Sequence, residues 1–241
     1  MNMIILAAGK NTRLDNGLPK SMLEIGGETL LERHLRLFSH FGVNNFCIVT
    51  GYRHEMLEGF IESFDDTLKS KITLAHNPRF DLANGRSLLA AHEWVTQNEI
   101  GEFFFTMADH FFSPEFVEAA MKAIYPDTTL TLVVDAPSST NAHIDLDDVT
   151  RVQSAAGLIQ SIAKHLEIYD FYDTGLFFAK KEMFELLAQS IQAGENSISN
   201  MVQLILARHQ ASVMEVSGHF WNDVDTPEDL KFMRNLTDKL S

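Results

Sequence analysis

Short apolar runs and helical apolar spacing alternate along the first half of the chain. Runs typical of strands buried on both faces lie at residues 4–6, 46–50 and 103–107, and a further strand is predicted at 71–75. Between them, apolar residues recur with helical spacing, which predicts helices at residues 31–41, 56–64 and 87–95. Strands that alternate with helices over short connections indicate a mainly parallel sheet with helices on both faces.

Capping residues mark several of the predicted helix ends. Gly42 lies where the C-terminal cap of the first helix is expected. Ser113 and Pro114 place a hydroxyl cap and a proline at the start of a later helix, and Thr226 and Pro227 do the same for the last one. Local chemistry therefore predicts where these helices begin or end.

The second half of the chain combines strand and helix signals differently. Strand-like runs lie at residues 130–134, 149–153, 158–163, 176–179 and 213–216, and a helix is predicted at 198–205. The turn at 154–157 makes the second and third runs a hairpin, and residues 137–141 are expected to form a loop. No linker or repeat separates the halves, so we expect one domain over residues 1–241. The predicted fold class is α/β, with three α/β/α layers around a mainly parallel, mixed central sheet.

Composition and charge narrow the class of partner. Of the 241 residues 45% are hydrophobic and 22% are charged, which is typical of a globular protein. Lys and Arg number 19 against 33 Asp and Glu, a net charge of −14, which argues against nucleic acid or an anionic membrane as the main partner. The single cysteine, Cys47, fits a reducing compartment. The apolar segment at residues 3–8 is too short for a signal peptide, so we expect a cytoplasmic protein without membrane insertion.

The turn that follows the first strand carries the strongest chemical signal in the chain. It consists of small and polar residues: Leu6, Ala7, Ala8, Gly9, Lys10, Asn11 and Thr12. Small residues let backbone N–H groups approach a polyphosphate, and Arg13 and Lys20 add cations to an otherwise acidic protein. The segment matches neither the dinucleotide fingerprint nor a Walker A loop. The alternative is a tight turn with incidental basic residues.

Three carboxylates are candidate ligands for one Mg²⁺. Asp109 follows the strand at 103–107 and is expected at the carboxyl edge of the sheet, where open α/β sheets bind ligands. Asp223 and Asp225 are two positions apart, so in an extended segment they point the same way. Mg²⁺ prefers such oxygen ligands. Asp225 also fits a residue that simply precedes the cap of the last helix.

Two further groups of residues lie near these motifs. Asn84 and Gly85 form a turn that opens a helix with Ser87, which suits contacts to a nucleobase, although plain turn chemistry explains the pair as well. The ten histidines show no metal-ligand spacing. Among them His110 is singled out because it follows Asp109 into the same predicted cleft.

The segment from Leu6 to Lys20 resembles the signature of the nucleotidyltransferases that make nucleoside-diphosphate sugars and alcohols. That signature is approximately L-A-A-G-x-G-x-R-L, followed by P-K. Asn11 stands where the family usually has glycine. Asparagine is the non-glycine residue that best tolerates a positive φ, so we expect the turn to survive the exchange.

The resemblance extends over nearly the whole chain and is closest to the CTP:inositol-1-phosphate cytidylyltransferases. It depends on Asn84-Gly85 with Ser87, on Ala108-Asp109-His110, on Tyr169 with residues 173–175, and on the run at 223–228. Phosphocholine and aminoalkylphosphonate cytidylyltransferases share most of these motifs. The identity of the acceptor therefore stays open among them.

The resemblance implies both a fold and a reaction. The fold is a Rossmann-like nucleotidyltransferase fold, with a nucleotide-binding part at about 1–125 and an acceptor-binding part at about 126–241. CTP is the implied co-substrate, Mg²⁺ the implied metal, and a phosphorylated alcohol or phosphonate the implied acceptor, with pyrophosphate released. Arg13 and Lys20 are the implied catalytic cations, because they would stabilise the charge that develops on the phosphates.

The same resemblance implies where the acceptor binds. The acceptor site would consist of His110, Lys164, Asp173 and Thr174. Two other functions stay open: a sugar-1-phosphate uridylyl- or thymidylyltransferase, and a nucleotide-sensing module without catalysis. Because the chain ends at Ser241, we expect no membrane-bound transferase after this domain, as some relatives have, and a homodimer stays open.

Overall fold

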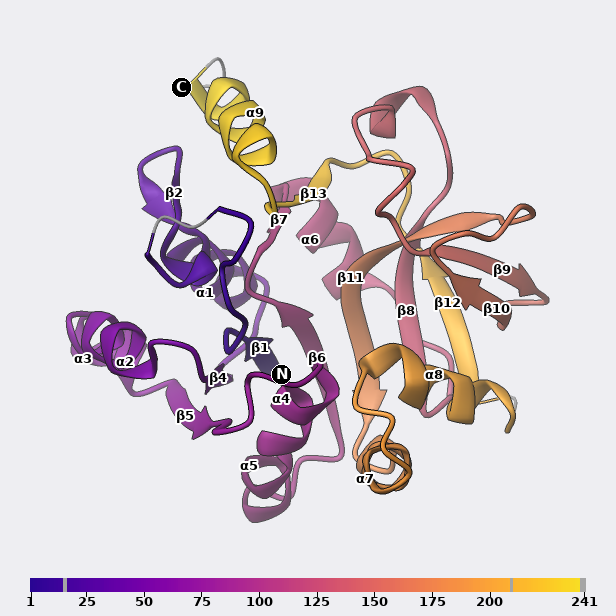
Figure 1. Ribbon diagram of the computed structural model, residues 1–241, viewed down its shortest axis with the longest axis horizontal. Coiled ribbons are helices and arrows are strands. Elements are labelled where there is room, and N and C mark those ends of the chain that lie inside the picture. The colour runs from indigo at the N-terminus through magenta and orange to yellow at the C-terminus, as the bar shows by residue number, and fades with distance from the viewer. Residues whose placement is uncertain (15–16, 209, 239–241) are drawn as a thin grey trace.

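A mixed β-sheet runs through both halves of the chain. The computed structural model describes residues 1–14, 17–208 and 210–238. Within these residues the main sheet has nine strands in the order β5-β4-β1-β6-β11-β8-β12-β10-β9 (Figure 1). Its strands are β1 (Asn2–Leu6), β4 (Asn45–Thr50), β5 (Ile72–His76), β6 (Glu102–Met107), β8 (Leu130–Asp135), β9 (Arg151–Ala155), β10 (Leu158–Ala163), β11 (Phe171–Lys180) and β12 (Ala211–Glu215).

The two halves of the sheet differ in strand direction. In the first half β5, β4, β1 and β6 are all parallel. Strand β11 is antiparallel to both β6 and β8, and β12 returns parallel to β8. The hairpin of β9 and β10 closes the far edge. The predicted mixed sheet is confirmed, and its antiparallel pairs lie within the second half and where β11 joins it to β6.

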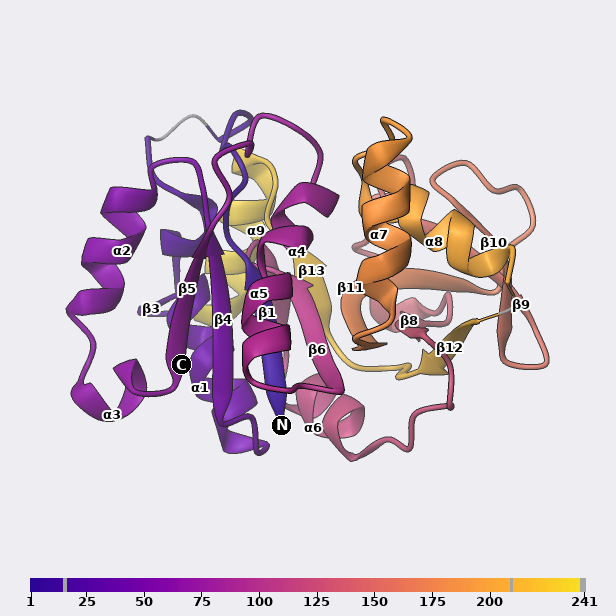
Figure 2. The same ribbon diagram turned by 90° about the horizontal axis from the view of Figure 1, so that it is seen from below.

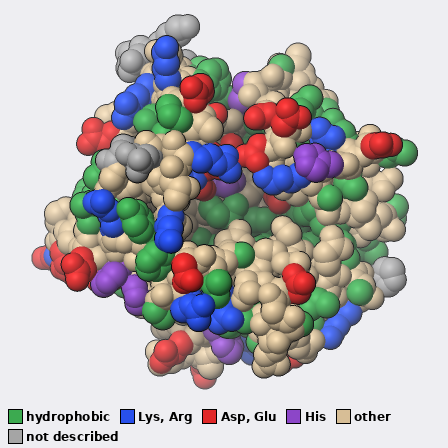
Figure 3. All heavy atoms as spheres, viewed as in Figure 1, with side chains coloured by type: hydrophobic (Ala, Val, Ile, Leu, Met, Phe, Trp, Pro, Cys, Tyr) green, Lys and Arg blue, Asp and Glu red, His purple; other side chains and the backbone are tan. Residues whose placement is uncertain are grey.

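Helices cover both faces of the sheet, so the molecule has three layers (Figure 2). One face carries α1 (Leu30–His40), α2 (His54–Glu62), α3 (Asp66–Lys69) and α6 (Pro114–Lys122), and the other carries α4 (Gly85–Ala90), α5 (His92–Gln97), α7 (Met183–Gln192) and α8 (Ile198–Leu206). On the side viewed in Figure 1, the surface is hollowed between the two halves (Figure 3).

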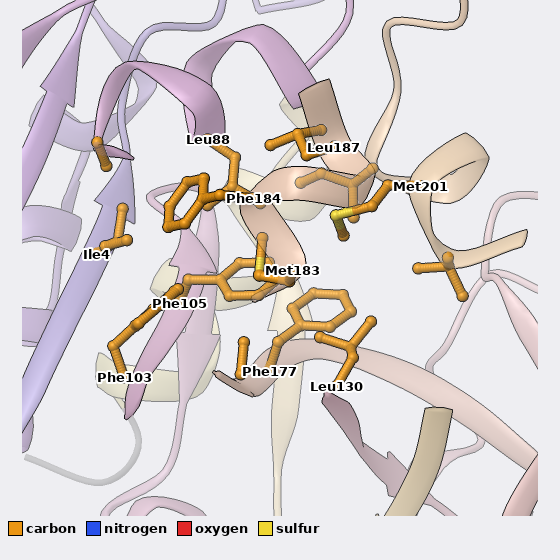
Figure 4. Packing of buried hydrophobic residues seen from close by; sticks show 14 of the residues in the cluster. Ile4, Leu88, Phe103, Phe105, Leu130, Phe177, Met183, Phe184, Leu187 and Met201 are labelled. Carbon is orange, nitrogen blue, oxygen red and sulfur yellow. The ribbon is translucent and has the colours of Figure 1, made fainter. Parts of the chain in front are cut away.

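Two apolar cores result from the alternation of side chains along the strands. In β1, Met3 and Ile5 pack on the side of α1 and α2, whereas Ile4 and Leu6 pack on the side of α4 and α7. Figure 4 shows the second core, where the Phe105 ring stacks on the ring of Phe177 with centroids 4.5 Å apart. Aromatic pairs from β6 and β11 thus hold the two halves of the sheet together.

Short elements form a separate cluster beyond the carboxyl ends of the strands. Strands β7 (His110–Phe112) and β13 (Trp221–Asp223) pair antiparallel, and β2 (Glu24–Ile25) pairs with β3 (Glu28–Thr29). The last helix, α9 (Pro227–Asp238), contacts β2. A small third core between them contains Leu23, Ile25, Phe111, Val224 and Met233.

The structure confirms most predicted elements and differs from the prediction at others. The helix predicted at 87–95 is two helices, α4 and α5, with Ala91 between them. The loop predicted at 137–141 contains a short 3₁₀ turn, Ser139–Asn141. Helix α7 and the ladder of β7 with β13 were not predicted. Within the described ranges, no helix is both long enough and apolar enough to cross a membrane.

Candidate active site

The carboxyl ends of β1 and β6 lie side by side and open into a pocket. Leu6 pairs with Met107 across the ladder, and the Ala108 N–H donates to the Leu6 carbonyl at 3.0 Å. The pocket has a volume of about 200 Å³. Its lining is Leu6, Ala7, Ala8, Gly9, Lys20, Ser21, Phe80, Leu82, Asn84, Ser87, Met107, Ala108 and Asp109. Most residues of the glycine-containing turn therefore face this pocket, as the small-residue pattern predicts.

Lys20 connects the pocket to the carboxylates beside it. It begins the short 3₁₀ helix Lys20–Met22, which follows Pro19. Its Nζ lies 3.0 Å from Asp109 Oδ2 and also pairs with Asp225 Oδ1. Burial disfavours the charged amine, but the two carboxylates outweigh it and raise the pKa of Lys20. The lysine is thus held charged between two of the candidate metal ligands.

The ladder of β7 with β13 brings the late carboxylates to the end of β6. Asp223 lies opposite His110 in this ladder, and the Val224 N–H donates to the Asp109 carbonyl at 2.9 Å. Asp109 is far in sequence from Asp223 and Asp225, yet the pairing of β7 with β13 places all three at one end of the sheet.

A third carboxylate joins Asp223 and Asp225. Oxygens of Asp148, Asp223 and Asp225 all lie within 4.8 Å of one another, and we call these residues the carboxylate cluster. Asp148 precedes β9, and sequence reasoning missed it because the acidic segment around it has no metal-ligand spacing. Asp109 is engaged differently, by Lys20 and by His110, whose Nδ1 lies 3.0 Å from Asp109 Oδ1.

Basic side chains neutralise the carboxylate cluster. Arg13 Nη1 lies 3.2 Å from Asp225 and 3.4 Å from Asp148. Lys164 pairs with the other oxygen of Asp148. Figure 3 shows Lys, Arg, Asp and Glu side chains gathered along one rim of the hollow. An incoming polyphosphate would therefore meet cations that are already concentrated here.

Burial and charge shift the pKa values of the acids in opposite directions. Burial disfavours the charged form of Asp109, but the hydrogen bond with His110 and the charge of Lys20 hold its pKa well below the ordinary value. Burial raises the pKa of Asp173 to about 6, although the Gly175 N–H partly offsets it. Burial also raises the pKa of Asp223; His110 opposes this shift, and the charges of neighbouring carboxylates add to it.

The candidate acceptor residues divide into two groups. His110 packs against Gly175, two residues after Asp173, and its charge acts against the rise that burial causes in the pKa of Asp173. Thr174 is fully buried, and its hydroxyl donates to the Val133 carbonyl at 2.8 Å. The structure thus places Thr174 in the sheet rather than at a surface open to substrate.

Gly175 belongs to the run at 173–175 that the resemblance depends on, but its close approach to His110 was not predicted. The ladder of β11 with β8 shifts register between Asp173 and Phe177, and Gly175 has φ +75° within the shift. A Cβ at Gly175 would overlap the His110 ring. The predicted strand at 176–179 begins after Gly175, whereas β11 includes it; a glycine within a strand is typical of such a close approach.

The predicted nucleobase residues already make hydrogen bonds within the protein. Asn84 Oδ1 accepts from the Ile198 N–H at 3.0 Å, and Ser87 Oγ accepts from Asn77 Nδ2 at 3.0 Å. Both line the pocket. Gly85 packs closely on the backbone at Asn196. A Cβ at position 85 would come within 2.6 Å of the Asn196 carbonyl oxygen.

Asn11 keeps the turn intact by a route other than the predicted one. Asn11 is not among the described residues with positive φ, so the turn does not need a residue that tolerates this conformation at position 11. Its Nδ2 donates to the Leu18 carbonyl at 3.0 Å. The side chain therefore ties the start of the loop to the segment that leads to Lys20.

Comparison with known proteins gives consistent matches. The family model of the MobA-like NTP transferase domain matches residues 3–211. A bifunctional IPC transferase and DIPP synthase of Aquifex aeolicus is 32% identical over 231 residues, covering 95% of this chain and 50% of that protein. The protein of the same name from Thermococcus kodakarensis is 33% identical over 238 residues, covering 97% and 50%. The chain thus spans about half the length of these curated relatives.

The fold has a counterpart of almost the same size among solved structures. The inositol-1-phosphate CTP transferase of T. maritima superposes with a TM-score of 0.82 and 23% identity, covering 99% of this chain and 95% of that one. At this identity the likeness concerns the fold, and it confirms the predicted nucleotidyltransferase-like architecture.

Proposed function

Because this chain belongs to the family of MobA-like NTP transferase domains, we propose that it transfers CMP from CTP to a small phosphorylated alcohol of the inositol-1-phosphate class. Residues at about 1–125 would bind the nucleotide, and residues at about 126–241 the acceptor. One observation carries the proposal: Lys20 joins the pocket at the ends of β1 and β6 to the carboxylate cluster. The pocket proposed for the phosphates therefore lies next to both a lysine and the carboxylates proposed to bind a metal. The names of the half-length relatives and of the T. maritima protein support the choice of acceptor.

The nucleotide would lie along the turn that follows β1. Gly9 has open space where a Cβ would stand, which suits close approach of phosphates to the backbone. The side-chain oxygen Oδ1 of Asn84 accepts a hydrogen bond from the Ile198 N–H. The NH₂ group of the same side chain is therefore the group proposed to contact a base. A donor there suits the unprotonated ring nitrogen of cytosine and opposes the N–H of uracil. This difference favours CTP over UTP.

The donor set of the carboxylate cluster suits Mg²⁺. Its ligands are oxygens, the type that this hard cation prefers. We propose that Asp223 of the cluster holds the ion together with Asp109, which lies outside the cluster and pairs with Lys20. Asp225 would be a third ligand, and the geometry adds Asp148 as a further candidate. A bound Mg²⁺ would supply charge neutralisation for the triphosphate.

The chemistry needs no general base. A phosphate monoester has a second pKa of about 6, so the acceptor oxygen is already mostly anionic at neutral pH. This oxygen attacks the α-phosphorus in line, a new P–O bond forms, and the bond to the bridging oxygen breaks to release pyrophosphate. Arg13 and Lys20 would exchange their carboxylate partners for phosphate oxygens and stabilise the developing charge.

The acceptor would bind beside His110 and Asp173. Lys164, now paired with Asp148, would supply a point charge for the acceptor's phosphate or phosphonate. Asp173 would accept from a hydroxyl, and its buried position favours a neutral partner over a second anion. Thr174 would contribute by fixing the backbone of β11, since its hydroxyl is bound to Val133.

A pyrophosphate-release screen tests the proposal. Purified protein would be given CTP, UTP, ATP, GTP or dTTP with a panel of phosphomonoesters, phosphonates and hexose-1-phosphates, with and without Mg²⁺. We expect the highest kcat/KM with CTP and inositol-1-phosphate, and no turnover without a divalent metal.

Two results would replace the proposal by an alternative. Turnover of UTP or dTTP with a hexose-1-phosphate would indicate a sugar nucleotidyltransferase. Saturable CTP binding without pyrophosphate release from any acceptor would indicate a sensing module. The Lys20→Ala variant controls for contaminating activity, because it removes the cation shared by the pocket and the carboxylate cluster.

A further inference from the structure

A second group of metal-ligating side chains lies away from the proposed active site. One ligand atom each of His54, Glu58 and His76 lies within 4.8 Å of the other two. None of the three lines the pocket at the ends of β1 and β6. We propose that they bind one divalent transition-metal ion of the Zn²⁺ class, and we call them the imidazole site.

The spacing of His54 and Glu58 presents two ligands from one helix. His54 is the first residue of α2 and Glu58 follows at i+4, so both side chains lie on the same face. His54 Nδ1 and Glu58 Oε1 are 3.3 Å apart. Ligands at Zn–N and Zn–O distances of about 2.0–2.1 Å in a tetrahedron are separated by about 3.3 Å. These two atoms therefore already have the separation that a tetrahedral ion requires.

His76 completes the site from the neighbouring strand. It ends β5, whose parallel pairing with β4 places it opposite Thr50. The rings of His54 and His76 have centroids 4.4 Å apart. Figure 1 shows α2 and β5 next to each other at the outer edge of the first half. The third ligand thus comes from a backbone position that the sheet fixes.

A buried hydroxyl holds two of the three ligands. Thr50 is fully buried, donates to Glu58 Oε1 at 3.0 Å, and lies 3.3 Å from His76 Nδ1. Outer contacts of this kind orient ligands and are as important to metal sites as the ligands themselves. Helix α2 begins after Arg53, whose φ of +50° makes it a left-handed N-cap residue directly before His54.

The ligand types distinguish this site from the carboxylate cluster. Two imidazoles and one carboxylate suit Zn²⁺, Co²⁺ or Ni²⁺, whereas an all-oxygen set suits Mg²⁺ or Ca²⁺. The His54 and Glu58 side chains are 40% and 35% exposed, which leaves room for water as a fourth ligand. The two sites are therefore expected to select different metals in one molecule.

Metal at the imidazole site would connect α2 to the segment that leads to the pocket. His76 directly precedes Asn77, whose Nδ2 donates to the pocket residue Ser87. An ion that binds only the folded chain stabilises it by mass action. We therefore expect Zn²⁺ to raise the Tm, and this rise does not depend on whether the chain turns over CTP.

Metal titrations of the full chain test the proposal. Protein stripped with a chelator would be titrated with Zn²⁺ against a chromophoric chelator, in excess Mg²⁺ to occupy the carboxylate cluster. Co²⁺ would be followed by its visible absorption. We expect one Zn²⁺ per chain and a Co²⁺ spectrum of four- or five-coordinate type. His54→Ala, His76→Ala and Glu58→Gln should each weaken Zn²⁺ binding at least about 100-fold.

A control variant on α1 and a variant of the carboxylate cluster show whether Zn²⁺ binds at the imidazole site or elsewhere. His40→Ala removes an imidazole on α1, outside the group, and should bind Zn²⁺ as the parent does. Circular dichroism would confirm that each variant is folded. Unchanged Zn²⁺ binding in folded His54→Ala and His76→Ala would overturn the proposal. So would Zn²⁺ binding that is lost in Asp223→Asn and kept in His76→Ala, because the ion would then occupy the carboxylate cluster.

Discussion

The pocket and the carboxylate cluster lie side by side but are built in opposite ways. The pocket is formed largely by consecutive residues at the ends of two adjacent parallel strands, β1 and β6. The carboxylate cluster takes Asp148 from the segment before β9 and Asp223 and Asp225 from β13 and the residues after it. The pocket thus depends on the pairing of two predicted strands whose ends carry recognisable motifs, whereas the cluster depends on pairing between segments too short to predict.

The two regions also differ in the number of carboxylates and in the repulsion between them. The lining of the pocket consists of apolar, small and neutral polar residues with one lysine and one aspartate. The cluster holds three carboxylates close together, and burial and neighbouring negative charges raise the pKa of Asp223. Arg13, Lys20 and Lys164 offset that repulsion. The cluster is therefore the region that gains most from a bound cation.

The largest effect is expected from removing a charge of the carboxylate cluster. Asp223→Asn should lower kcat about 10³-fold or more, because neutralisation of phosphate charge by a held metal contributes several kcal/mol. Pyrophosphate release over a range of Mg²⁺ concentrations measures it. Asp147→Asn, an exposed neighbour of Asp148, is the matched control and should keep full activity. Turnover of Asp223→Asn within tenfold of the parent at saturating Mg²⁺ would contradict the assignment.

Lys20 is the side chain that both regions share, and its loss should be nearly as costly. Lys20→Ala should lower kcat by about 10²–10³, by analogy with loss of one donor to a developing negative charge. Single-turnover rates with CTP and acceptor measure the effect. Lys69→Ala, a surface lysine of α3, should leave those rates unchanged. If Lys20→Ala raised only the KM for CTP, the lysine would serve binding rather than the transition state.

A buried aspartate anchors the segment that carries the cluster. Asp135 is fully buried and accepts from Trp221 Nε1 at 2.9 Å, Asn141 Nδ2 at 2.8 Å and the Gly218 N–H at 3.3 Å. Asp135→Ala leaves these donors unpaired and should lower the free energy of unfolding by about 3 kcal/mol.

Urea unfolding measures the loss in free energy of unfolding, and two further variants serve as comparisons. Asp135→Asn keeps one acceptor oxygen and should lose less, while Asp127→Ala, at an exposed position, should change the free energy of unfolding by less than about 0.5 kcal/mol. Since Asp135 holds Trp221, kcat should fall in Asp135→Ala as well. An unchanged unfolding midpoint in that variant would show that the network does not anchor β13.

The smallest effect is expected at the edge of the carboxylate cluster. Lys164→Ala should raise the acceptor KM about tenfold and leave the CTP KM unchanged, since one exposed point charge contributes about 1.4 kcal/mol at most. Initial rates with each substrate varied in turn separate the two constants. An equal rise in both would place Lys164 at the nucleotide instead of the acceptor.

The sequence alone determined several strands of the first half of the sheet and the residue types at the pocket. Apolar runs predicted β1, β4 and β6 because strands buried on both faces need continuous apolar side chains. The cap at Ser113 was also predictable, since its Oγ accepts from the Phe116 N–H three residues on. These features depend on neighbours in the chain, so a single sequence contains the information needed to predict them.

Only the tertiary structure decided how the distant residues meet. Pairing of β7 with β13, each three residues long, brings Asp223 opposite His110, and segments so short carry no periodicity that could predict it. Asp148 and the imidazole site likewise depend on contacts between separate elements. Local sequence predicts elements because propensity and capping act over a few residues, whereas a site made from several elements depends on packing between them that no short window of sequence contains.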